Sequence, residues 1–310
     1  MYFNQFLIKV NGVRMGGEKL DILGLSVTES ISNYSIMVTK IKKVLITKKT
    51  KYQDVQIVEF HDFGRGLILD GLIQSTEADE FIYHESLVQP VMVTHPKPER
   101  VLIIGGGEGA TLREVLKHER VVNEVTMVDI DGELIELAKK YLDFMHQGAF
   151  SHPKAKIIVS DGREYVKRSP SNHFDVVILD LTDPYGPEIA KELYSREFYS
   201  EVKRILKDDG IMVTQAGSSF FYPKVYKYVL KNITVNFPIV REYWVWVPSY
   251  GYACNFIIGS LKYDPKALGA EDVENTLSIR GVKSKLKLYS GNFHEALFKS
   301  PIIVGLAAET

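Results

Sequence analysis

The chain has 310 residues, 45% of them apolar, which is enough for one large domain or for a large domain with a smaller companion. The 38 Lys and Arg residues nearly balance 39 Asp and Glu residues, and a net charge of −1 concentrates neither nucleic acid nor anionic lipid. The single cysteine, Cys254, excludes an intrachain disulfide framework, and no apolar run reaches the roughly 18 residues that span a bilayer. We therefore expect a cytoplasmic protein that binds neither nucleic acid nor membrane.

The first 95 residues predict a small antiparallel meander. Residues 1–36 contain short apolar pieces broken by glycines, and we expect them to form an N-terminal extension of unknown role. From residue 37 onward, apolar and polar residues alternate in short segments that are separated by turns containing Gly and Asp. Thr76 precedes an acidic stretch that is typical of a helix start. The sequence thus predicts an N-terminal β-domain with a linking helix over residues 37–95.

Beyond residue 95 the pattern changes to strands and helices in alternation. Apolar strands are expected at 101–104, 124–128, 156–159, 176–179 and 211–214, with helices at 110–117, 133–145 and 198–206 and two late strands within 242–260. Continuous apolar strands that alternate with helices favour a parallel sheet covered on both faces. Residues 96–310 are therefore predicted to form one α/β domain.

The first candidate binding feature is a glycine loop that follows the strand at 101–104 and opens a helix. Glycines such as Gly105 and Gly107 let the backbone approach a ligand closely. Asp129 lies 20 positions after Gly109, at the end of the next strand, where a carboxylate can accept both ribose hydroxyls of a nucleoside. A tight strand-to-helix turn is the alternative interpretation of the glycines alone.

Two further strand ends carry carboxylates. Asp161 can accept the exocyclic amine of adenine while Gly162 leaves room for the ring, although Asp161 could equally cap the following helix. Asp180 and Asp183 follow the next apolar strand, where a plain polar loop is the alternative. Because the carboxyl ends of parallel strands meet at one crevice, we expect these acids to gather there. Such a cluster implies a cationic ligand.

Taken together, these motifs resemble those of the spermidine synthase family of polyamine aminopropyltransferases, over roughly residues 39–258. The resemblance is carried by Lys51-Tyr52-Gln53, Leu69-Asp70-Gly71, Gln74-Ser75-Thr76-Glu77, residues 79–85, the glycine loop, Asp161-Gly162, the run from Asp180 to Pro187, and Gln215. It implies an α/β fold in which a small N-terminal antiparallel β-domain precedes a methyltransferase-like Rossmann domain with a mostly parallel sheet. It also implies a homodimer or homotetramer.

The resemblance further implies a role for individual residues. Asp180 would accept a proton and anchor the acceptor amine. The donor would be held by Gln53, Gly105, Gly107, Asp129, Asp161, Gly162 and Pro187. The polyamine channel would be lined by Tyr83, His84, Glu108, Asp183 and Gln215. For Tyr83 and His84, a helix face packed in the core is the alternative.

The implied reaction moves the aminopropyl group of decarboxylated S-adenosylmethionine to a polyamine and releases methylthioadenosine. The donor is a co-substrate that carries its own leaving group, so the protein must orient the reactants and accept one proton, with neither metal nor cofactor. Glu108 would repel the carboxylate of the full donor by about 3 kcal/mol at about 5 Å and an effective dielectric of about 20. An S-adenosylmethionine-dependent methyltransferase and a catalytically silent polyamine- or nucleoside-binding protein of the same fold are the alternatives.

One departure from the family pattern concerns the acceptor. Val247 stands where many spermidine synthases have a tyrosine, and together with the Gly-Gly-Gly-Glu-Gly loop it resembles the thermospermine synthase branch. Loss of that ring would open the far end of the acceptor pocket. Spermidine, putrescine and a related longer amine are all candidate acceptors.

Overall fold

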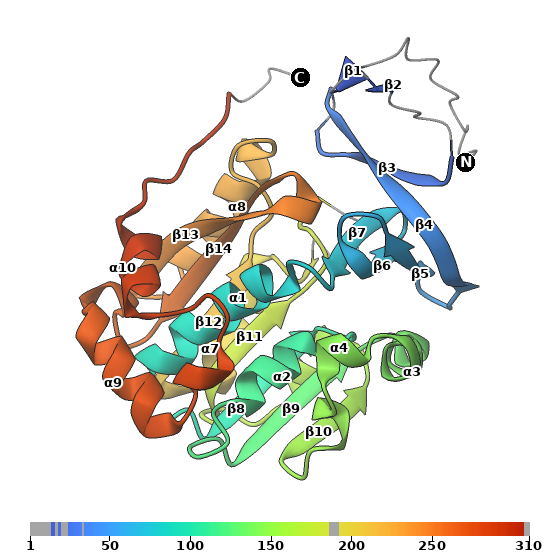
Figure 1. Ribbon diagram of the computed structural model, residues 1–310. Helices are drawn as coiled ribbons and strands as arrows, with labels where there is room; N and C mark the ends of the chain where they lie inside the picture. The colour runs from blue at the N-terminus through green and yellow to red at the C-terminus, as the bar shows by residue number, and fades with distance from the viewer. Residues whose placement is uncertain (1–13, 16–17, 20–23, 33, 186–191, 307–310) are drawn as a thin grey trace.

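The computed structural model describes residues 14–15, 18–19, 24–32, 34–185 and 192–306, which form two main sheets (Figure 1). The N-terminal sheet is antiparallel, in the order β3-β4-β5-β6-β7. Its strands are β3 (Ser26–Ser30), β4 (Ile36–Lys49), β5 (Asp54–Phe60), β6 (Gly64–Leu69) and β7 (Leu72–Thr76), and a separate ribbon pairs β1 (Arg14–Met15) with β2 (Glu18–Lys19). The expected meander is confirmed.

The N-terminal sheet begins ahead of the boundary expected at residue 37. Strand β3 lies within residues 1–36 and pairs with β4 from Ser26 opposite Lys40 to Ser30 opposite Ile36. Strand β3 therefore belongs to the N-terminal sheet, although the sequence analysis placed its residues in the extension. The sequence signal was weak because β3 has only five residues, too few for a clear period.

The second sheet has seven strands in the order β10-β9-β8-β11-β12-β14-β13. Its strands are β8 (Arg100–Gly105), β9 (Glu124–Asp129), β10 (Ala155–Val159), β11 (Phe174–Asp180), β12 (Leu206–Gln215), β13 (Ile239–Val247) and β14 (Tyr252–Ser260). The first five strands of that order are parallel, and β14 runs antiparallel to both β12 and β13. This is the mostly parallel Rossmann-like sheet that the sequence predicted.

Helices cover both faces of this sheet (Figure 1). They are α1 (Glu80–Thr94), α2 (Ala110–Leu116), α3 (Gly132–Tyr141), α4 (Asp143–His146), α5 (Gly162–Arg168), α7 (Arg196–Ile205), α8 (Pro223–Thr234), α9 (Ala270–Arg280) and α10 (Gly291–Lys299), with 3-10 turns η1 (Ala149–Ser151), η2 (Pro248–Tyr250), η3 (Pro265–Ala267) and η4 (Lys283–Lys285). The helix expected over 133–145 is two helices, because Leu142 leaves the helical region at φ −120° and ψ 42°. The sequence analysis did not predict α8, α9 or α10. Within the described ranges, no helix combines the length and apolar character that crossing a membrane requires.

The chain order of the parallel strands reverses between β8 and β11. Strand β8 is followed by β9 on one side, whereas β11 returns to its other side, with Asp180 opposite Gly105 at the carboxyl ends. Such a switch point leaves a crevice where ligands bind in open α/β sheets. The N-terminal sheet closes it from one side, since Val55 and Leu67 pack against Leu134 and neighbouring residues of α2, α3 and α4.

Candidate active site

A cavity of about 550 Å³ opens at this switch point, within the size range of small-molecule sites. It is lined by every sequence-predicted site residue that the structure describes: Gln53, Tyr83, His84, Gly105, Gly107, Glu108, Asp129, Asp161, Gly162, Asp180, Asp183 and Gln215. Pro187 lies outside the described residues. The structure therefore brings together residues from both domains and from five strand ends, those of β8, β9, β10, β11 and β12.

Asp180 lies at the end of β11 and is fixed by two hydroxyls. The phenol of Tyr83 donates to Oδ1 at 2.8 Å, and Thr111 Oγ1 donates to Oδ2 at 2.6 Å. Burial raises the pKa of Asp180 to about 6, and nearby Glu108 adds to the rise, whereas His84 and the two hydroxyls oppose it. The carboxylate is thus ionised at neutral pH and more basic than an ordinary aspartate.

Asp183 sits at the wall of the cavity among tyrosines. Tyr252 donates its phenol to Asp183 Oδ2 at 3.4 Å, and Tyr185 stacks on Tyr222 with ring centroids 3.8 Å apart. Burial raises the pKa of Asp183, while the nearby polar groups of Tyr185, Gln215 and Tyr252 lower it. An acid between aromatic faces suits an alkylammonium group, which ring faces also attract.

Gln215 lines the same wall, but its amide is already engaged by the protein. Nε2 donates to the carbonyl of Leu181 at 2.8 Å and to the hydroxyl of Tyr194 at 3.0 Å, and Oε1 accepts the N–H of Gly217 at 2.8 Å. Gln215 therefore holds the loop that follows β11, and with it the position of Asp183.

The opposite end of the cavity carries the donor-binding candidates from β9. Asp129 accepts the N–H of Asp131 at 2.8 Å, and burial raises its pKa to about 6. A Cβ at Gly107 would come within 2.9 Å of Asp129 Oδ2, which explains the glycine. Gln53 reaches across from the N-terminal domain and donates to Asp131 Oδ2 at 2.8 Å. Gln53 thereby ties the two domains together beside Asp129.

Asp161 and Gly162 form the third strand end, after β10. Asp161 Oδ1 accepts the N–H of Glu164 at 3.0 Å, so the helix-capping interpretation is confirmed although the residue also lines the cavity. A Cβ at Gly162 would overlap the side chain of Ile104. Packing against Ile104 therefore requires a glycine at position 162, whether or not the adenine ring of a ligand lies beside it.

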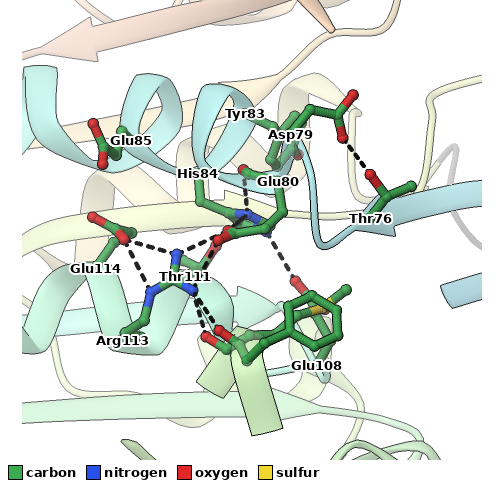
Figure 2. Close-up of polar contacts among 12 residues, drawn as sticks. Thr76, Asp79, Glu80, Tyr83, His84, Glu85, Glu108, Thr111, Arg113 and Glu114 are labelled. Atoms are coloured by element: carbon green, nitrogen blue, oxygen red, sulfur yellow. Dashed lines mark hydrogen bonds and ion pairs between the residues drawn. The ribbon is translucent and has the colours of Figure 1, made fainter. Parts of the chain in front are cut away.

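His84 is the centre of a buried chain of ion pairs (Figure 2). Its Nδ1 donates to the carbonyl and carboxylate of Glu80 at 2.7 and 2.9 Å, and its Nε2 donates to Glu108 Oε1 at 3.1 Å. Burial opposes a charge on the ring, but the hydrogen bonds to Glu108 and Glu80 outweigh it and raise the pKa of His84 to about 10. The ring is therefore an imidazolium at neutral pH.

Arg113 pairs with Glu80, the other carboxylate that contacts His84. Its guanidinium donates to both carboxylate oxygens of Glu80, at 3.1 and 2.8 Å, and to Glu114 Oε1 (Figure 2). Burial opposes ionisation of Glu80, but its bonds to His84 and Arg113 prevail and lower its pKa to about 2. The chain fixes His84, and His84 in turn fixes Glu108 at the cavity.

Comparison with known protein families shows the family to which the chain belongs. Residues 27–77 match the spermidine synthase tetramerisation domain, and residues 80–266 match the spermine/spermidine synthase domain. The chain belongs to the spermine/spermidine synthase family. The second match covers most of the Rossmann-like domain, including every acid of the cavity that follows a parallel strand.

Relatives in this family are similar over most of their length. A polyamine aminopropyltransferase of Pyrobaculum aerophilum is 54% identical over 277 residues, covering 89% of this chain and 94% of the relative. Polyamine aminopropyltransferase 1 of Hyperthermus butylicus is 48% identical over 259 residues, or 83% and 88% of the two chains. A spermidine synthase crystallised with the transition state analogue AdoDATO superposes with a TM-score of 0.82 at 35% identity, over 89% of this chain and 92% of that one. Spermidine synthase from Thermotoga maritima gives 0.79 at 34%, over 89% and 91%.

The argument from Val247 is not supported by the packing. Val247 is 1% exposed and belongs to the main core, and it is not among the described residues that line the cavity. Tyr250 and Tyr252 form the wall in that region. The absence of a tyrosine at position 247 therefore does not open the end of the acceptor pocket in this structure.

Sequence reasoning missed several residues that shape the site. Thr111, which donates to Asp180, stands in the first turn of α2, where its helix-start position was the available signal. The cavity tyrosines that escaped notice are Tyr185, Tyr222, Tyr250 and Tyr252. Tyr250 and Tyr252 lie together at the turn that opens β14, whereas Tyr185 and Tyr222 come from two other loops, so no single period relates the four.

The geometry also bears on metal binding. Donor atoms of His84, Glu108 and Asp180 lie within 4.8 Å of one another. A histidine can ligate a metal only through a free lone pair, and both ring nitrogens of His84 donate hydrogen bonds. The group suits an ammonium better than a metal ion.

Proposed function

We propose that the protein transfers the aminopropyl group of decarboxylated S-adenosylmethionine to a polyamine, with Asp180 as proton acceptor. The observation that carries the proposal is the half-buried Asp180 carboxylate, whose pKa is raised to about 6 at the switch point, in one cavity with Asp183 and Glu108. The donor is a co-substrate, and neither a cofactor nor a metal takes part.

The chemistry needs little beyond placement and one base. The acceptor nitrogen attacks the methylene carbon beside the sulfonium, the carbon–sulfur bond breaks, and its electron pair stays on sulfur in neutral methylthioadenosine. The proton of the attacking amine passes to Asp180. An alkylamine with a pKa near 10.4 is almost wholly protonated at pH 7, so a carboxylate that binds the ammonium and then takes its proton supplies the missing nucleophile.

The donor occupies the β8 and β9 side of the cavity. Asp129 accepts the ribose hydroxyls, Asp161 and Gly162 border the adenine, and Gly105 and Gly107 allow the backbone close to the donor. Gln53 and Pro187 are assigned to the same group by family resemblance.

The acceptor occupies the β11 side of the same cavity. Asp183 binds the acceptor, and Gln215 holds the loop that carries Asp183. The aminopropyl chain of the donor extends toward this side, where Tyr83 and His84 border it and Glu108 binds its terminal ammonium. A methyltransferase would need room there for a donor carboxylate, which Glu108 repels.

The decisive experiment is product analysis by mass spectrometry. The protein is incubated with a panel of linear diamines, triamines and tetraamines, in one series with the decarboxylated donor and in a second with S-adenosylmethionine. Methylthioadenosine and the new amine are quantified. Equimolar release of both supports the proposal. Methyl transfer from S-adenosylmethionine, or binding without turnover, would replace it by one of the two alternatives.

We also propose that the protein is a homotetramer assembled through its N-terminal sheet. Residues 27–77 match a tetramerisation domain, and this sheet leaves Ile36, Val38 and Val44 exposed. Exposed apolar residues gathered on one element are typical of an interface. Light scattering coupled to gel filtration should give four times the mass of the 35.2 kDa chain.

A further inference from the structure

A buried carboxylate of the N-terminal sheet lines the cavity opposite the Rossmann-like domain. Glu29 lies on β3, is only 7% exposed, and borders the cavity together with Ser30 and Ile31. It comes from a segment that the sequence analysis assigned to an extension of unknown role. The cavity therefore has an acid on its N-terminal wall in addition to those at the strand ends.

The carboxylate of Glu29 is only half satisfied. Oε1 accepts the N–H of Ile73 at 2.6 Å, whereas buried Oε2 accepts no hydrogen bond from the described part of the chain. Burial raises the pKa of Glu29 to about 7, against the bond from Ile73, which lowers it. Buried polar atoms are nearly always paired, so an unpaired carboxylate oxygen on a residue that lines a ligand cavity indicates a group that can turn to pair with the ligand.

Tyr252 places Glu29 near the acceptor side of the cavity. The Tyr252 phenol donates to Asp183 at 3.4 Å. The ring of Tyr250 lies 5.7 Å from that of Tyr252 and donates its phenol to a carbonyl of β7, the strand that also bonds to Glu29. Glu29 and Asp183 therefore flank the same pair of tyrosines. Burial raises the pKa of Tyr252, and the charges of Asp183 and Glu29 raise it further.

We infer that Glu29 binds the terminal ammonium of the acceptor and makes the site select amines with at least three nitrogens. The inference rests on the proposed aminopropyl transfer. Three carboxylates then serve three nitrogens: Asp180 takes the proton of the reacting nitrogen, Asp183 binds the second, and Glu29 binds the third. A diamine leaves Glu29 without a cation, whereas a triamine pairs it.

The first test compares a triamine with a diamine in the variant Glu29→Gln. Removing one partner of a buried charge-assisted hydrogen bond lowers binding by about tenfold or more. We expect kcat/KM for spermidine to fall at least about tenfold, while kcat/KM for putrescine changes by less than about threefold. The matched control is Glu59→Gln on β5, whose carboxylate pairs with Lys42 at 2.6 Å outside the cavity. This control should leave both values unchanged.

A second test uses the unchanged protein and a modified acceptor. N-butyl-1,3-diaminopropane has the length of norspermidine, the symmetric triamine with two aminopropyl arms, but one of its ends is a methyl group that offers nothing to Glu29. We expect its kcat/KM to be at least about tenfold below that of norspermidine. This test stays valid even if Glu29→Gln does not fold, which methylthioadenosine binding by calorimetry would reveal.

The outcomes separate the inference from the function it rests on. If the unchanged protein releases no methylthioadenosine with any amine, aminopropyl transfer itself is wrong. If the protein turns over but Glu29→Gln lowers kcat/KM equally for the diamine and the triamine, the role of Glu29 is wrong and aminopropyl transfer stands. The same follows if the amine with the terminal methyl group has the kcat/KM of the triamine.

Discussion

Replacing Asp180 by asparagine should abolish turnover and at the same time stabilise the fold. The substitution keeps the shape of the side chain and the contacts with Tyr83 and Thr111, whose hydroxyls can turn to meet an amide. It removes the proton acceptor, and general-base catalysis is worth about 10² to 10⁴ in rate. It also removes a buried negative charge that the fold holds at a cost.

The size of the stabilisation follows from the pKa of Asp180. A pKa of about 6 against an ordinary 3.8 means that the native state holds the proton more tightly than the unfolded chain. Stability therefore falls as pH rises from about 4 to about 6, and the full penalty, on the order of 3 kcal/mol, is present above pH 6. Asp180→Asn should recover most of this at pH 8 and roughly half of it at pH 5.

The assay is unfolding in guanidinium chloride at both pH values and one protein concentration, with methylthioadenosine release measured alongside. Asp175→Asn is the matched control, because Asp175 lies at the other end of β11 and is more deeply buried than Asp180. Its carboxylate accepts the N–H groups of Glu99 and Arg100 and pairs with Lys207 at 2.6 Å. Asp175→Asn should therefore destabilise the protein by about 1–3 kcal/mol.

Two results would refute this reasoning. A variant Asp180→Asn that keeps more than about a tenth of the original rate is incompatible with a general base. A variant that is less stable than the original protein at pH 8 would show that the carboxylate is stabilised by its surroundings and not strained by burial.

Three further predictions concern the neighbours of the base. With Glu80→Gln, the pKa of His84 should fall from about 10 to below about 8, because the ring loses a charged partner. NMR titration of the ring measures this pKa, and an unchanged value would contradict the ion-pair chain. Gly107→Ala should displace the Asp129 carboxylate and so weaken methylthioadenosine binding about tenfold. Calorimetry measures this affinity, and an unaltered value would show that the carboxylate does not hold the ribose. The full donor, S-adenosylmethionine, should bind at least about tenfold more weakly than its decarboxylated form because of Glu108, so equal affinities would argue against that role.

The sequence alone determined the architecture and the carboxylates at the strand ends. Alternating strands and helices imply a parallel sheet, and in a parallel sheet the carboxyl ends of the strands share one edge. Asp129, Asp161 and Asp180 each follow such a strand, so their meeting in one cavity was predictable from local pattern. Domain placement was less accurate at the N-terminus, where β3 is too short to show a period.

Only the tertiary structure decided how those acids are tuned and what completes the cavity. Tyr83 meets Asp180 across 97 positions of the chain, and Glu29 bonds to Ile73 across 44. The first contact depends on how α1 packs on the Rossmann-like sheet, and the second on how β3 and β7 approach each other within the N-terminal sheet. Periodicity reports which face of an element is buried, but it carries no information about the partner. The raised pKa of Asp180 and the half-paired carboxylate of Glu29 therefore exist only in the folded tertiary structure.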